Sequence, residues 1–179
     1  MNTVNNQRHQ DTVRRILDAM LALLEEKAFE RITVTDICKA ADINRSTFYR
    51  HYTNPSDLME QLASQFHRGM LAQWAIEKNA SAPITQEALC RMLSYILEHR
   101  VFYRVYLHRF RGQPEPFLDD YLLPLFEDHG VLSRRHMEYY YHYVASGFIS
   151  VISHWLERES PESPEEIAKL LYAILPTPR

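Results

Sequence analysis

Apolar residues recur every three or four positions along most of the chain, and no segment alternates apolar and polar residues as a half-buried β-strand does. This spacing predicts amphipathic helices that pack their apolar faces together. Their expected positions are about residues 11–29, 33–41, 45 onward, 55–77, 85–97, 134–159 and 163 onward. An aromatic segment is expected at residues 101–112, and a helix interrupted at Pro124 within residues 117–128. The pattern therefore predicts an all-α protein.

The most informative segment is residues 31–58, which has the pattern of two short helices joined by a tight turn. Thr33 and Asp36 have the spacing of a capping box, in which each side chain satisfies a free amide at the start of a helix. Asp42 falls where the chain reverses, and Asn44 is placed to cap a second helix that begins at Arg45. Two short helices separated by such a turn form a helix-turn-helix pattern.

Residues 33–58 closely resemble the N-terminal DNA-binding domain of the TetR family of bacterial transcription regulators. The positions that carry the resemblance are Thr33, Ile37, Ala41, Ile43, Ser46, Thr47, Phe48, Tyr49, His51, Tyr52 and Leu58. The resemblance implies that the chain binds a double-stranded DNA operator. The remainder resembles the family in its helical character and length alone. We therefore expect a helix-turn-helix DNA-binding domain at residues 1–54 and a helical dimerisation and effector or partner domain at residues 55–179.

Two positions depart from the pattern of this family. Asp42 stands where the family often has glycine, and aspartate can adopt the left-handed backbone conformation at some cost. Pro55 stands where the family often has a lysine that binds phosphate. We expect Arg8, Lys39 or Arg50 to replace that contact.

The first residues of the second helix are expected to read the DNA sequence. In a helix-turn-helix these residues meet base edges in the major groove, and here they are Arg45, Ser46 and Thr47. The guanidinium of Arg45 can pair with O6 and N7 of guanine. The alternative is an arginine that binds phosphate or is solvated, since arginine serves all these roles.

Other side chains are expected to grip the DNA backbone. The resemblance implies phosphate contacts by Tyr49 and His51, and the free amides of the helix that follows Thr33 favour an anion there. The alternatives are a half-buried, packed ring for Tyr49 and a histidine satisfied within the fold for His51. Thr35 and Arg50 are weaker candidates, which face either the groove or solvent.

The charge pattern predicts a modest grip by each copy of the chain. The net charge is −3, which counts against a broad DNA-binding patch because phosphate contacts supply most non-specific affinity. Residues 31–51 nevertheless carry more cations than acids. We expect residues 1–10 to form a polar, mobile arm that can touch DNA, and the main gain in affinity to come from pairing two copies.

Residues 134–159 predict a helix that must be covered on two sides, because apolar or small residues form two adjacent stripes along it. With the final helix, it resembles the pair of helices that makes the four-helix dimer interface of the family. A two-fold dimer suits a DNA site with two halves. The expected interface residues are Tyr143, Gly147, Phe148, Val151, Trp155, Leu170 and Ile174. The alternative is that both stripes belong to the core.

The C-terminal part is also rich in aromatic residues. In the family this part commonly senses a small molecule or a partner, so the rings are candidates for a ligand pocket, and the alternative is an ordinary aromatic core. The candidates are Tyr95, Phe102, Tyr103, Tyr106, Phe110, Phe117 and Tyr121. Residues 139–171 are similar to a branch of the family that includes dihydroxyacetone-operon activators, which work through a partner protein.

Several other classes of protein are disfavoured. The sequence has no phosphate-binding loop, nucleophile elbow or helical His-Glu-x-x-His motif, so we expect no catalysis, cofactor or metal site. Cys38 and Cys90 are expected to be small buried hydrophobes rather than a disulfide. No window is long and apolar enough to cross a membrane, and the start lacks a signal-peptide pattern, so we expect a cytoplasmic protein.

Two functions remain open at this point. The first is a homodimeric, sequence-specific DNA-binding repressor that a small-molecule effector releases. The second is a transcriptional activator that depends on a partner protein and has no small-molecule ligand of its own. Stabilisation by a ligand favours the first, and a gain in DNA affinity that requires a partner favours the second.

Overall fold

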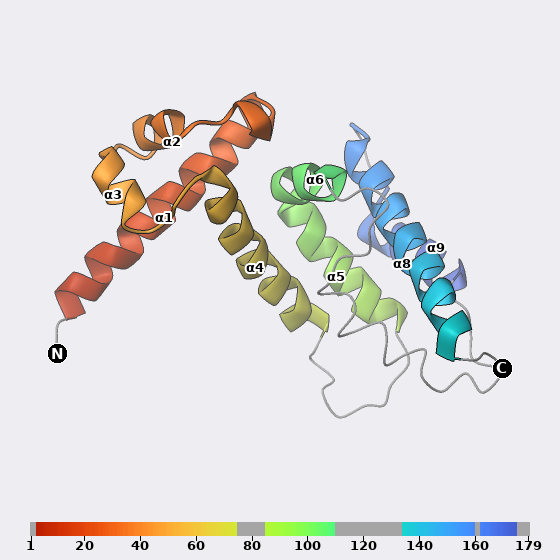
Figure 1. Cartoon of the computed structure of the whole chain (residues 1–179). Helices are drawn as coiled ribbons and strands as arrows, with labels where there is room; N and C mark the ends of the chain where they lie inside the picture. Colours follow the sequence, from red (N-terminus) through yellow and green to blue (C-terminus); the bar gives the residue numbers. More distant parts are fainter. Residues whose placement is uncertain (1–2, 75–84, 110–133, 160–161, 175–179) are drawn as a thin grey trace. The chain divides into compact units, whose positions relative to one another are not determined.

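The structure is a computed structural model that describes residues 3–74, 85–109, 134–159 and 162–174 (Figure 1). Within these ranges every regular element is helical, which confirms the all-α prediction. The chain divides into two compact units, Met1–Phe66 and His67–Arg179. This division falls inside the helix that was expected to begin at residue 55. No helix of the described ranges has the length and apolar character needed to cross a membrane.

The N-terminal unit consists of four helices and a short 3-10 turn. They are α1 (Thr3–Glu26), η1 (Phe29–Arg31), α2 (Val34–Ala40), α3 (Arg45–Tyr49) and the first part of α4 (Pro55–Trp74). The side chains at the centre of its core have almost no exposed surface, and they are Ile16, Met20, Ile37, Phe48, Leu58 and Leu62. Burial of Ile37 and Phe48 holds α2 and α3 in this unit and leaves their other faces in solvent.

Helix α1 begins earlier than the apolar spacing predicts. It reaches back to Thr3, so the expectation of a mobile arm is wrong for residues 3–10. Polar residues can extend a helix whose packed part has already formed, because adding a residue costs much less than nucleating a turn. The Thr12 hydroxyl donates to the Arg8 carbonyl over 2.9 Å, and Arg8 and His9 lie exposed on this added part.

The predicted caps of the N-terminal unit are confirmed. Thr33 and Asp36 form a capping box at the start of α2, Asn44 caps α3, and Asn54 accepts two amide hydrogen bonds at the start of α4. The Lys27 ammonium lies 2.9 Å from the Asp36 carboxylate. Hydrogen bonds from Lys27 and Thr33 lower the pKa of Asp36 to about 2. The carboxylate that caps α2 therefore stays ionised well into the acid range.

The C-terminal unit contains the end of α4 and four further described helices. They are α5 (Gln86–Glu98), α6 (Arg100–Arg109), α8 (Arg134–Glu157) and α9 (Pro164–Ile174). Helix α5 packs against α9, and α6 packs against α8 (Figure 1). Thr85 caps α5, and Ser163 and Glu166 bond each other's backbone amides at the start of α9. Both helix starts agree with the sequence prediction.

The aromatic segment after residue 100 is helical as far as Arg109. Its buried rings, Phe102, Tyr103 and Tyr106, recur at helical spacing and fill one side of α6. The expected cap at Gly112 and the expected helix at residues 117–128 lie outside the described residues.

The chain turns after α8 at a corner that side chains hold in place. The guanidinium of Arg100 on α6 donates to the carbonyls of Leu156 (3.2 Å) and Arg158 (2.6 Å), which satisfies acceptors at the C-terminal end of α8. The indole N–H of Trp155 donates to the Glu162 carbonyl over 2.8 Å, just before α9 begins. These three bonds fix the corner from inside the unit.

Gly69 permits the close approach of α4 and α5 within the C-terminal unit. A Cβ atom at this position would lie 2.0 Å from the hydroxyl oxygen of Tyr95, which is far inside van der Waals contact. The guanidinium of Arg91 adds a hydrogen bond to the Gln73 carbonyl over 3.2 Å. This role of Gly69 could not be predicted from the sequence, because a close approach depends on which helices meet.

His67 is buried in a cluster of aromatic rings of the C-terminal unit. Its ring centroid lies 4.9 Å from that of Tyr106, 6.4 Å from that of Tyr103 and 6.5 Å from that of Phe102. Burial lowers the pKa of His67 to about 4. This imidazole is therefore neutral at neutral pH.

We predict that His67 makes the protein less stable as the pH falls from about 6.5 to about 4. In the unfolded chain His67 takes up a proton below its ordinary pKa, whereas in the folded chain burial prevents this, so acid favours the unfolded state. The loss approaches about 3 kcal/mol over the whole interval. Urea unfolding at several pH values tests this. His67→Leu should flatten the dependence, and an equally steep dependence in that variant would contradict the assignment.

Candidate nucleic-acid interface

The turn between α2 and α3 has the left-handed residue that the sequence analysis expected. Asp42 has φ = 51°, and it is the non-glycine residue with positive φ among those described. The amide of Ala41 donates to the Ile37 carbonyl (2.8 Å), and the amide of Ile43 donates to the Cys38 carbonyl (3.0 Å). These bonds close the end of α2 in the manner of a left-handed C-cap and turn the chain toward α3.

The start of α3 is held by Asn44. Its side-chain oxygen accepts hydrogen bonds from the Thr47 amide and the Ser46 hydroxyl, each over 2.7 Å. Ser46 is exposed, whereas Thr47 is half-buried. Of the two residues that follow Arg45 at the start of α3, Ser46 is therefore more accessible to DNA bases than Thr47.

Arg45 and Tyr49 form a pair on the exposed face of α3. The guanidinium donates to the Tyr49 hydroxyl over 3.3 Å and lies 5.9 Å from the centre of its ring. Tyr49 keeps half of its surface exposed, at 50%, and its ring meets the buried ring of Phe48 edge to face at 5.6 Å. The hydrogen bond to Tyr49 raises the pKa of Arg45 above its ordinary value. The pair presents a permanent cation with most of its five N–H donors still available.

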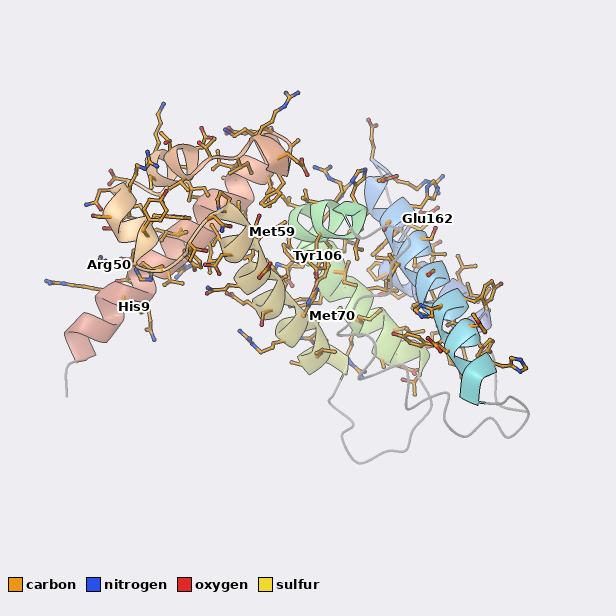
Figure 2. All side chains as sticks on the ribbon, in the orientation of Figure 1. His9, Arg50, Met59, Met70, Tyr106 and Glu162 are labelled. Carbon is orange, nitrogen blue, oxygen red and sulfur yellow. The ribbon has the colours of Figure 1, made fainter. Side chains whose placement is uncertain are left out.

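His51 lies just after α3 and is half-buried. Its ring packs against that of His9 on α1, with centroids 4.6 Å apart, and His9 and Arg50 are placed on the same side of the unit (Figure 2). Burial, His9 and Arg50 all lower the pKa of His51. His51 is therefore neutral in the free protein at neutral pH. The contact with His9 was missed, because it joins residues far apart in the sequence.

The N-terminus of α2 offers less to an anion than the sequence suggests. The Thr33 amide and hydroxyl both donate to the Asp36 carboxylate, over 2.9 and 2.7 Å. Groups that already have a charged partner are poorer donors to a phosphate. Thr35 and Arg50 are exposed, as are Arg8 and Lys39, which the sequence analysis proposed as substitutes for the missing lysine.

The candidate pocket residues that the structure describes pack against one another. Phe102 and Tyr106 are stacked at 5.2 Å, and Tyr103 meets Phe102 edge to face at 5.1 Å. All three are buried, and Tyr95 is half-buried. The three buried rings are thus packed on one another among the described residues. The other candidates, Phe110, Phe117 and Tyr121, lie outside the described residues.

The candidate dimer residues divide into two sets. Phe148 and Trp155 are buried inside the C-terminal unit, and Val151 is half-buried. Tyr143, Gly147, Leu170 and Ile174 are exposed, and so is Tyr139, which the prediction did not include. Tyr139 and Tyr143 lie on successive turns of α8, and Leu170 and Ile174 lie on successive turns of α9. Exposed apolar side chains that recur in this way are typical of surfaces that bind protein. The exposed set, rather than Phe148 and Trp155, is thus available to a second chain.

Other kinds of chemistry find little support among the described residues. No three histidine, cysteine or acidic side chains in those ranges gather closely enough to hold a metal ion. Cys38 is buried as expected, whereas Cys90 is half-buried, and both are free thiols. Burial raises the pKa of each, which makes thiolate chemistry unfavourable.

Comparisons with known proteins point to the same kind of molecule. Residues 16–62 match the family model described as bacterial regulatory proteins of the tetR family. Residues 85–177 match the TetR-type model described as the transcriptional regulator C-terminal region. Together the two models cover most of both units.

Two curated relatives and one solved structure illustrate the similarity. The HTH-type regulator YxbF of Bacillus subtilis (strain 168) is 24% identical over 169 residues, which are 90% of this chain and 44% of the relative. The dhaKLM operon activator DhaS of Lactococcus lactis subsp. lactis (strain IL1403) is 31% identical over 93 residues, 52% of this chain and 47% of the relative. This chain thus spans less than half the length of these curated relatives.

The solved structure of a TetR transcriptional regulator from Streptococcus agalactiae 2603V has the same fold. It superimposes with a TM-score of 0.65 over 97% of this chain and 98% of the other, at 20% sequence identity. At this level of identity the similarity concerns the fold alone.

Proposed function

Since the chain belongs to the TetR family of DNA-binding transcription regulators, which are not enzymes, we propose a specific role for it. The chain acts as a homodimeric repressor, and a small-molecule effector releases it from its operator. The observation that carries the DNA-reading part is the exposed Arg45–Tyr49 pair on a helix whose start is fixed by Asn44. In this proposal the protein acts in the cytoplasm, where it binds its DNA operator.

In this proposal α3 enters the major groove, Arg45 and Ser46 meet base edges, and Thr47 packs behind them. Tyr49, Arg50 and His51 then contact the DNA backbone, with Thr35 beside them. Most of these side chains are exposed on the same short stretch. Selection of bound sequences from a random DNA pool tests this. A two-fold symmetric consensus is expected, and recovery of no preferred sequence would contradict it.

The proposed dimer surface is formed by Tyr143 and Gly147 on α8 with Leu170 and Ile174 on α9. All four are exposed, and the three larger side chains are apolar or aromatic. Two copies that share this surface place two copies of α3 on the two halves of one operator. Affinity then comes from two modest contacts made at once, which suits a chain with a net charge of −3.

A second function, an activator that works through a partner protein, is favoured by two observations. The curated relative that is 31% identical is a transcriptional activator. The described aromatic candidates also pack on one another. Two measurements with fractions of a cell extract separate the two proposals. Thermal stabilisation by a small-molecule fraction supports the repressor, and a gain in operator affinity, titrated in the presence of a protein fraction, supports the activator.

We predict that operator affinity increases a few-fold as the pH falls from about 8 to about 6, through His51. Its pKa is lowered in the free protein by burial, His9 and Arg50, so the imidazole is neutral there. A phosphate beside it favours the charged form, so binding takes up a proton and strengthens in acid. His51→Gln should remove this dependence, and His142→Gln, at an exposed site on α8, should retain it. Equal dependence in both variants would count against the phosphate contact.

A further inference from the structure

Arg15 connects α1 to the turn between α2 and α3. Its guanidinium Nη2 donates to the carbonyl of Ala41 and, over 2.5 Å, to the carbonyl of Asp42. It also lies 3.4 Å from the Asp42 carboxylate. One side chain from the first helix thus engages both carbonyls of a turn that lies 26 and 27 residues further along the chain.

The turn needs such support. Asp42 has φ = 51°, a conformation that costs an L-residue free energy and that glycine adopts freely. The Ala41 carbonyl ends α2, where carbonyls lack helical partners and the helix dipole favours a cation. The guanidinium of Arg15 satisfies both needs, because its Nη2 group offers two N–H donors and the side chain carries a positive charge.

We propose that Arg15 is a positioning residue for DNA recognition, which holds the α2–α3 turn in its left-handed conformation and thereby sets the direction of α3. The inference rests on the proposed reading of DNA by α3. The direct ion pair with the Asp42 carboxylate is a minor part of it, since that carboxylate is fully exposed and exposed pairs contribute little. The two carbonyl contacts carry the effect.

The competing explanation is that Arg15 binds a DNA phosphate directly. Its neighbour Arg14 provides a matched control, because it lies on the same helix, is largely exposed and pairs only weakly with Asp18 at 3.9 Å. Arg14→Met and Arg15→Met change the net charge equally. A difference between them therefore reports the turn rather than the charge.

The first measurement is hydrogen exchange of the whole chain of 179 residues in the absence of DNA. Arg15→Met should accelerate exchange at residues 41–47 and leave the core of α1 unchanged, whereas Arg14→Met should exchange like the original protein. Unchanged exchange at residues 41–47 in Arg15→Met would overturn the inference. If Arg15→Met does not fold, Arg15→Lys replaces it, since it keeps the charge but its ammonium lies one atom closer to the backbone than the Nη2 group that contacts the two carbonyls.

The second measurement is affinity for the selected operator. Arg15→Met should weaken it by about tenfold, which corresponds to the loss of about one net charged hydrogen bond. Asp42→Gly should recover much of that loss in the Arg15→Met background, because glycine needs no clamp at positive φ. A loss that is equal on random DNA, lowers the salt slope of the dimer by about two, one for each copy, and is not recovered by Asp42→Gly would instead assign Arg15 to a phosphate.

The two arms keep the inference separate from the proposed function. If the original protein prefers no DNA sequence, the proposed function fails, while hydrogen exchange still decides whether Arg15 holds the turn. If the original protein binds its operator and Arg15→Met binds it equally well, only the inference fails.

Discussion

Arg45→Ala is expected to remove most of the preference of the protein for its operator and to leave its non-specific DNA binding nearly intact. A bidentate contact between a guanidinium and guanine contributes about 1–3 kcal/mol of discrimination in each half-site. The cost for a dimer, which makes the contact twice, is correspondingly larger. Arg45 is suited to this role because its guanidinium is exposed, permanently charged and steadied by the Tyr49 hydroxyl.

Salt dependence distinguishes this role from a phosphate contact. Titrations of operator and of random DNA at several salt concentrations should give parallel salt slopes for Arg45→Ala and the original protein. Tyr49→Phe, which removes the hydrogen-bonding partner of Arg45, should produce a weaker effect of the same kind. An equal loss on every sequence, with a shallower slope, would show that Arg45 binds phosphate instead.

Gly147→Arg is expected to convert the proposed dimer into monomers without unfolding the chain. A Cβ atom at Gly147 would meet nothing within 4 Å, so a large side chain fits on the single chain and projects into solvent. Across a two-fold axis the same change places two bulky cations against each other, and both steric overlap and charge repulsion oppose association. The weight-average mass from light scattering should fall by half, and operator affinity should fall with it.

The matched control is Ser94→Arg, which adds the same side chain at an exposed position on α5. It should leave both mass and DNA affinity unchanged. Circular dichroism spectra should be alike for the two variants and the original chain, because neither position lies in the core. A Gly147→Arg protein that keeps the mass of a dimer would place the interface elsewhere on the chain.

What could be predicted from the sequence was mostly local. Thr33 with Asp36, and Asn44 with Thr47, are joined over three residues, so their spacing alone predicts the caps that the structure contains. The same holds for Asp42, whose place between two short helices requires a left-handed residue. The Arg45–Tyr49 pair has i, i+4 spacing and could have been found in the same way.

Contacts between distant parts of the chain could not be predicted. The bonds from Arg15 to the α2–α3 turn and the contact between His9 and His51 depend on how α1 crosses its neighbours, and helical periodicity does not determine crossing. The periodicity of α8 likewise shows that two stripes need cover, but not which one the chain covers itself. The structure answers this by burying Phe148 and Trp155 and exposing Tyr143.

The corner after α8 bears on how related regulators diverge. Arg100 and Trp155 fix it through bonds to backbone carbonyls, and the exposed Tyr143 on α8 and Leu170 on α9 make none of these bonds. Substitutions there can alter which chain is accepted as a partner while the helices keep their course. Duplicated copies of such a gene can therefore acquire incompatible surfaces by a few exchanges at positions such as Tyr143 and Leu170, and so avoid forming mixed pairs in one cell.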